Sequence, residues 1–202
     1  MIALLDTNED LNLCEQELGC PVQQLITPTT RRLRQRPDAL FAIDNGAFSG
    51  FNRDMFLSLL EHNQDAKSLC LFVAVPDIVG NARRTQEAFD WWRYKLSAWP
   101  LALVAQDGIE DLPIEWNAIS AIFIGGSTGW KLSKAAADVI RCAKIVHKWV
   151  HVGRVNTPGR FEYFEELGAD SIDGSGLARF SWMREEIYRR MTHPTLFTEA
   201  HA

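Results

Sequence analysis

The sequence has little of what marks a membrane, secreted or metal-binding protein. No run approaches the ~18 consecutive apolar residues of a membrane span. The first ten residues, MIALLDTNED, turn acidic early and carry no basic segment, so they do not resemble a signal peptide. Cysteine is scarce and shows no CxxC spacing, so we expect reduced packing thiols and no metal site. The four cysteines are Cys14, Cys20, Cys70 and Cys142.

The chain also lacks a basic excess and any Pro-, Gly- or Ser-rich linker. It has 21 Lys and Arg against 26 Asp and Glu, a formal net charge of −5, so bulk charge does not indicate a nucleic-acid binder. Hydrophobic residues make up 47% of the 202 residues, which is enough for a substantial core. We therefore expect a single domain over residues 1–202.

Short apolar runs alternate with longer amphipathic runs, a pattern typical of parallel α/β proteins. The expected strands are Met1–Leu5, Val22–Ile26, Leu40–Ile43, Leu69–Val75, Leu101–Ala105, Ala121–Ile124, Trp149–Val152 and Ser171–Ile172. The expected helices cover Asn8–Leu18, Asn52–His62, Asn81–Ser97, Ser133–His147, Gly159–Leu167 and Phe180–Met191. Thr29–Arg36 reads as a basic turn or short helix, and Asp107–Asn117 as a reduced crossover. Eight strands favour a compact, TIM-like (β/α)8 barrel over an open doubly wound sheet.

Polar residues and glycines follow the expected strands. They are Asp44, Asp77, Gln106, Gly125, Gly126, Gly153, Arg154 and Asp173. In a parallel barrel the carboxyl ends of all strands meet at one mouth, where these groups would converge. Carboxylates, an amide and glycine backbone suit a purine-like heterocycle, on which Phe48 can stack. Two carboxylates beside a glycosidic bond can supply a nucleophile and a proton donor. An Asx turn closing a strand accounts for Asp44 equally well when that residue is taken alone.

Six motifs, taken in order, resemble those of the tRNA-guanine transglycosylases. The matched segments are Asp44–Phe48, Asp77, Ala105–Gly108, Gly125–Gly126, Ser171–Gly174 and Arg179. Those enzymes also carry a CxC…C…H zinc cluster, which this shorter chain lacks. It is therefore more similar to the 7-deazapurine-in-DNA protein A branch of phages and bacteria, whose members exchange guanine in DNA for a 7-deazaguanine. Segments His151–Asn156 and Gly125–Trp130 carry the same resemblance.

The resemblance implies a pentosyltransferase with a defined role for each matched residue. Asp173 would be the covalent nucleophile and Asp44 the general acid and base. The base would be read by Asp77, Gln106 and the backbone of Gly125 and Gly126, with Phe48 stacked on it. Gly153 and Arg154 would belong to the substrate site, and Arg154 and Arg179 would meet phosphates. The resemblance implies no cofactor and a cytoplasmic protein, in the host cytoplasm if phage-encoded. Its partner would be nucleic acid, DNA rather than RNA, and a second protein that engages the DNA is left open.

Two other functions fit the same residues. An N-glycoside hydrolase on a barrel would keep both acids and release free guanine, and a non-catalytic module would only hold a base or nucleic acid. Further cations for phosphate are Arg31, Arg32, Arg34, Arg36 and Arg160, although a basic run is more often a solvated face.

Some residues have a plain structural interpretation. We expect His151 to be a core or barrel-wall histidine and Asp6 and Asp170 to be turn or helix-end acids. Trp130, on a mouth loop, and Asp107 stay open between packing and substrate contact.

Overall fold

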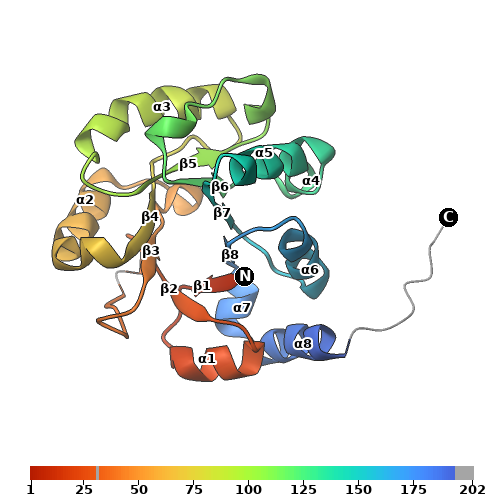
Figure 1. Cartoon of the computed structure of the whole chain (residues 1–202). Helices are drawn as coiled ribbons and strands as arrows, with labels where there is room; N and C mark the ends of the chain where they lie inside the picture. Colours follow the sequence, from red (N-terminus) through yellow and green to blue (C-terminus); the bar gives the residue numbers. More distant parts are fainter. Residues whose placement is uncertain (31, 194–202) are drawn as a thin grey trace.

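A computed structural model describes residues 1–30 and 32–193 and confirms the predicted barrel (Figure 1). Eight parallel strands pair in chain order, and β1 pairs with β8 to close the ring. The strands are β1 (Ile2–Leu5), β2 (Val22–Ile26), β3 (Phe41–Ile43), β4 (Cys70–Ala74), β5 (Leu101–Ala105), β6 (Ala121–Ile124), β7 (Trp149–Val152) and β8 (Ser171–Ile172). Strands β1, β3 and β4 are one residue shorter than predicted at one or both ends, and the others match.

Alternation along each strand divides the apolar residues between two cores. One set fills the barrel, and it includes Leu4, Phe72, Val104 and Phe123. The residues between them, such as Ile122, face outward and pack under the helices. Side chains of successive residues point to opposite faces of a strand, so a parallel sheet covered by helices needs apolar residues at nearly every position. The filled interior leaves open space only where the strands end.

Within residues 1–30 and 32–193, six helices of eight residues or more cover the barrel. They are α1 (Leu11–Leu18), α2 (Arg53–His62), α3 (Ala82–Lys95), α5 (Lys134–Ile145), α6 (Pro158–Glu166) and α8 (Ser181–Thr192). The side chains of Asn52, Asn81 and Ser133 cap the first turns of α2, α3 and α5. The short helices α4 (Thr128–Lys131) and α7 (Ser175–Arg179) were not predicted. The reduced crossover after β5 consists of two 3-10 turns, Ile109–Asp111 and Trp116–Ala118.

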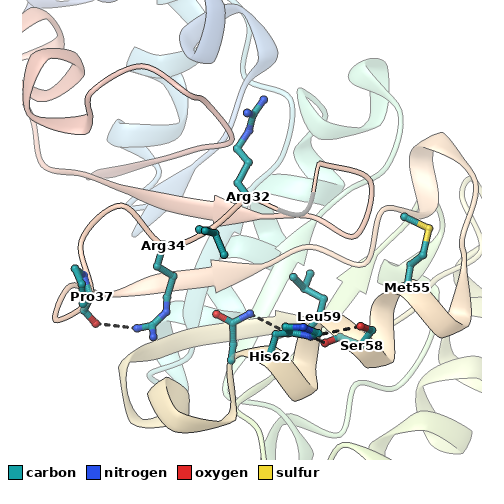
Figure 2. A pocket seen from close by; sticks show the side chains of 9 residues that line it. Arg32, Arg34, Pro37, Met55, Ser58, Leu59 and His62 are labelled. Carbon is teal, nitrogen blue, oxygen red and sulfur yellow. Dashed lines mark hydrogen bonds between the residues drawn. The ribbon is translucent and has the colours of Figure 1, made fainter.

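Between β2 and β3 the described residues form a loop of turns and bends, here called the strap, and no helix; the sequence predicted a turn or a short helix. Gln24 fixes this strap, because its side chain accepts from the Gln35 N–H at 2.8 Å and donates to the Leu33 carbonyl at 2.9 Å. A groove of about 510 Å³ lies between the strap and α2 (Figure 2). Figure 2 shows Arg34 turned toward the Pro37 carbonyl, with Met55, Leu59 and His62 on the facing helix.

The arginines of the strap pair with acids of this chain. Arg32 contacts Asp6 at 2.6 Å, Arg34 contacts Asp65 at 3.3 Å and Arg36 contacts Glu15 at 3.3 Å. Because these arginines already pair with acids of the chain, the contacts favour a structural role for the basic run over a role in binding phosphate. Arg31 lies outside the described residues.

Asp170, expected as a turn or helix-end acid, accepts from Lys144 at 2.6 and 2.7 Å and from the Val150 N–H at 2.7 Å.

No helix in the described part of the chain has the length and apolarity needed to cross a membrane.

A buried arginine joins the last helix to the first. Arg184 of α8 is 1% exposed and contacts Glu17 at 2.6 Å, Glu9 at 2.5 Å and the Leu177 carbonyl at 2.6 Å. Removing one partner of a buried ion pair leaves the other charges uncompensated. Because Glu9 and Glu17 keep some contact with water, the penalty falls below that of a fully buried pair.

We predict that Arg184→Ala lowers the free energy of unfolding by about 2–3 kcal/mol, measured by urea denaturation. Arg189→Ala on the same helix is the matched control. Arg189 is exposed and pairs with Glu186 one turn away, so its loss should cost no more than ~0.5 kcal/mol. Equal effects of the two substitutions would contradict a structural role for the Arg184 contacts.

Candidate functional site

A cavity of about 180 Å³ opens where the strands end, at the predicted mouth. Seven of the ten predicted site residues line it, and they come from the loops after β3, β4, β5, β6, β7 and β8. The seven are Asp44, Phe48, Asp77, Gln106, Gly125, Arg154 and Asp173. Residues far apart in the chain therefore meet because the barrel brings every strand end to one face.

Asp44 follows β3 and lines this cavity. Its backbone N–H continues the ladder to the Ile26 carbonyl at 2.9 Å, while its carboxylate accepts a long bond from the Gly46 N–H, 3.4 Å. Burial, together with the nearby charges of Asp173 and Asp77, raises the pKa of Asp44 to about 7. A substantial fraction of Asp44 therefore carries a proton at neutral pH.

A chain of amides links the loops after β3, β4 and β5. Asn45 donates to Asp77 Oδ1 at 2.8 Å and to the Val75 carbonyl at 2.9 Å. Gln106 donates to Asp77 Oδ2 at 2.7 Å, and its own carbonyl accepts from the Gly80 N–H at 2.9 Å. Burial raises the pKa of Asp77, and the two amide donors oppose that shift. These contacts fix Asp77 and Gln106 side by side as a rigid hydrogen-bonding edge.

Asp173 follows β8 and is held at both oxygens. Its Oδ1 accepts from the Arg154 N–H at 2.9 Å, and its Oδ2 lies 3.0 Å from His151 Nε2. His151 Nδ1 lies 2.9 Å from Ser171 Oγ, which also accepts from Trp149 Nε1 at 2.8 Å. The consistent assignment has the Ser171 hydroxyl donate to Nδ1, so that Nε2–H donates to Asp173. The network orients the Asp173 carboxylate.

His151 is therefore both a core residue, as expected, and the partner of Asp173. It is fully buried inside the barrel, with its ring 4.9 Å from Phe72 and 4.5 Å from Phe123. The register pairs His151 with Ser171 across β7 and β8. The signal in the sequence was a lone polar residue at an inward position of an apolar strand, two residues from the mouth.

Arg154 crosses the mouth from β7 to the loops after β6 and β3. Its backbone has a left-handed φ of 59°. Its Nη2 donates to the Gly125 carbonyl and, at 2.5 Å, to the Gly126 carbonyl. Its guanidinium carbon lies 4.5 Å from the centroid of the Phe48 ring, which is 68% exposed at the rim. Arg154 is thus turned toward this chain's own loops.

The two glycines after β6 are required by close packing. A Cβ at Gly125 would lie 2.7 Å from Val104 Cγ1, and one at Gly126 would lie 2.5 Å from Asp107 Oδ2. Both backbone N–H groups donate to the Ala105 carbonyl, at 2.9 and 3.1 Å. Arg154 donates to the carbonyls of both glycines. The N–H and C=O groups of Gly125 and Gly126, which were expected to contact a base, therefore already have partners within the chain.

Three predicted residues do not line the cavity. Gly126 accepts a hydrogen bond from Arg154 at its carbonyl but does not line the cavity. Gly153 packs against Phe123, and a Cβ at this glycine would lie 2.6 Å from Phe123 Cε1. The Gly153 carbonyl accepts from the buried Lys131, whose pKa burial and the Arg154 charge lower to about 8. Nothing in the sequence pattern singled out Lys131. Arg179 ends α7 and is exposed.

Residues that the sequence left open have structural partners. Trp130 is buried and donates to Glu110 at 2.9 Å. Asp107 accepts from the Ser127 N–H at 2.6 Å and from its hydroxyl at 2.5 Å, and Ser127 in turn caps α4. Among the residues that the structure describes, no three His, Cys, Asp or Glu side chains are grouped closely enough to hold a metal ion.

The raised pKa of Asp44 makes a prediction about stability. The folded state binds a proton that the unfolded state has lost between about pH 4 and pH 7, so ionisation of Asp44 destabilises the fold as the pH rises through this range. Asp44→Asn removes the ionisable group. We therefore expect the free energy of unfolding of the variant, relative to that of the native chain, to be about 1–3 kcal/mol higher at pH 8 than at pH 4. Urea denaturation across this range tests it, and parallel pH curves would contradict it.

Comparisons with known proteins extend only to the fold. No family model and no curated protein matches the sequence. Among solved structures, a flavocytochrome b2 variant superposes with a TM-score of 0.52 at 13% identity, over 95% of this chain and 61% of that one. A native KDPGal structure gives 0.46 at 13% identity, over 95% of this chain and 93% of its own. The chain spans less than two thirds of the flavocytochrome, and at this identity the likeness shows the TIM-barrel fold alone.

Proposed function

We propose that this chain is a guanine transglycosylase that exchanges guanine in nucleic acid, preferably DNA, for a 7-deazaguanine. The observation that carries the proposal is the pairing of two differently held acids in one cavity. Asp44 has a pKa near neutrality, and Asp173 has both oxygens fixed by donors. Asp77 and Gln106 add a hydrogen-bonding edge beside them.

In the proposed reaction Asp173 attacks C1′ of the target nucleotide. The C1′–N9 bond breaks, its electron pair goes to the departing guanine, and protonated Asp44 supplies the proton. The product is a glycosyl ester on Asp173. The incoming 7-deazaguanine gives a proton to Asp44 and attacks C1′, and Asp173 leaves as a carboxylate. Two displacements retain the configuration, as in retaining glycosidases. A base within a duplex would first be flipped out, at a cost of a few kcal/mol.

The charges of the cavity favour a base over a small phosphate ester. Three carboxylates line it, against the one guanidinium of Arg154. This excess of acidic groups repels an anion and suits N–H donors. Barrels that bind phosphates often use the loop after the eighth strand and a short extra helix. Here the first turn of α7 is closed, because the Gly176 N–H donates to Asn156 Oδ1 at 2.9 Å.

An N-glycoside hydrolase is the second candidate, because the same two acids would serve water as the acceptor. It differs in the fate of the glycosyl ester, and release of guanine without incorporation of a deazapurine would favour it. A binding module without catalysis would form no ester on Asp173.

We predict that Asp173→Asn abolishes the glycosyl adduct and lowers base exchange at least ~10³-fold, because the nucleophile is lost. Asp44→Asn should lower exchange ~10²–10⁴-fold through loss of the proton donor and acceptor. The assay follows labelled 7-deazaguanine entering guanine-containing DNA by mass spectrometry. Asp138→Asn, an exposed acid on α5, is the matched control and should leave the rate unchanged. Exchange at the native rate by Asp173→Asn would refute the assignment.

A polymer surface is proposed beside the cavity, at the start of α8. Phe180 and Trp182 are exposed and stacked, with ring centroids 6.1 Å apart at 30°, next to the exposed Arg179. Because α7 directly follows Asp173, this group lies at the mouth end of the barrel. Exposed aromatic rings with a cation are typical of single-stranded nucleic-acid binding.

We predict that Trp182→Ala weakens binding of a single-stranded DNA oligonucleotide about 5- to 100-fold in fluorescence anisotropy, because a base loses its stacking partner. Arg179→Ala should reduce the slope of log K against log salt by about 0.7. The control is Trp91→Ala on α3, which removes a similarly exposed tryptophan away from the α8 group. Equal binding by Trp182→Ala and Trp91→Ala would exclude this surface.

A further inference from the structure

Arg154 places a flat, donor-rich cation inside the cavity. The guanidinium stacks over Phe48 and donates through Nη2 to the carbonyls of Gly125 and Gly126. It also lines the same cavity as Asp77 and Asp173. Arg154 therefore occupies the face of Phe48 and the two glycine carbonyls, which are the groups that a planar ligand in this cavity would stack on and donate to.

The chemistry of a guanidinium resembles one edge of a guanine-type base. Both have a carbon bonded to several nitrogens in one plane, and both present N–H donors in that plane with a π face above it. An aminated purine or 7-deazapurine can therefore stack on Phe48 and donate to carbonyl oxygens as Arg154 does. A ligand that takes these contacts must displace the guanidinium.

We propose that Arg154 is a built-in occupant of the base subsite and that a guanine-type base enters by displacing its guanidinium from Phe48 and the two glycine carbonyls. This inference rests on the proposed function, because it names the subsite that the exchanged base uses. It replaces the expected role of Arg154 as a fixed phosphate contact with a role in admitting the base.

The backbone allows this exchange without disturbing Asp173. The Arg154 N–H holds Asp173 Oδ1 at 2.9 Å, and the left-handed φ of 59° sets that N–H independently of the side chain. The guanidinium can therefore swing out while the carboxylate keeps both of its donors. Outside the cavity it lies on the rim, where it can meet the phosphate of an incoming nucleotide.

The test compares 7-deazaguanine binding to the native chain and to Arg154→Asn by calorimetry. Asparagine accepts a left-handed φ and presents no guanidinium. If Arg154 fills the subsite nine-tenths of the time, its removal strengthens binding about tenfold. Arg154→Lys keeps the charge without the planar fork and should fall between the two. Weaker or unchanged binding by Arg154→Asn would overturn the proposal, because Arg154 would then be a ligand of the base or have no part in its entry.

Guanidinium chloride supplies a second readout that needs no base. At about 10 mM, far below denaturing concentrations, it should refill the subsite of Arg154→Asn and compete with 7-deazaguanine there but not in the native chain. Sodium chloride at the same ionic strength is the control. In NMR, the Gly125 and Gly126 amide signals should shift with guanidinium in the variant only. If no base binds to either protein, the proposed function fails, and this titration still decides the role of Arg154: a shift in the variant alone supports it, and no shift overturns it.

Discussion

The site depends on the closure of the barrel by its shortest strand. β8 has two residues, and its register joins Ser171 to Ile2 on one side and to His151 on the other. This pairing brings the end of β8 beside the end of β7, so that Asp173 meets the ring of His151 and the N–H of Arg154. A closed ring also leaves no free strand edge, which allows strands this short to be stable.

Closure also sets the two acids in different surroundings. Asp173 has donors at both oxygens, whereas Asp44 faces the charges of Asp173 and Asp77 and accepts one long bond from Gly46. Two carboxylates in unlike environments can divide the work of nucleophile and proton carrier. The division follows from backbone geometry, because the donors to Asp173 come from β7 and its loop, which lie next to β8 but not next to β3.

The strands and the shared mouth could be predicted because apolar runs mark buried parallel strands and topology brings their ends together. This sequence pattern predicts that Asp44, Asp77, Gln106 and Asp173 surround one mouth, and all four line the cavity there. It could not give the direction of a long side chain. Arg154 turns inward onto Phe48 because a left-handed backbone aims it there, and no pattern in the sequence encodes that angle. The path of the strap after β2 and the contact of Arg184 with Glu17 of α1 depend on interactions between distant residues, which periodicity does not report.

The placement of Arg154 reduces the electrostatic repulsion among the acids of the cavity. Three carboxylates around so small a space repel one another, and a neighbouring cation reduces that cost. The charge of Arg154 lowers the pKa of Asp77, whose burial otherwise raises it. A base that displaces the guanidinium removes this charge but brings N–H donors to the same edge, so Asp77 keeps partners. Entry of the base therefore replaces a charge that compensates Asp77 with donors that can pair with it.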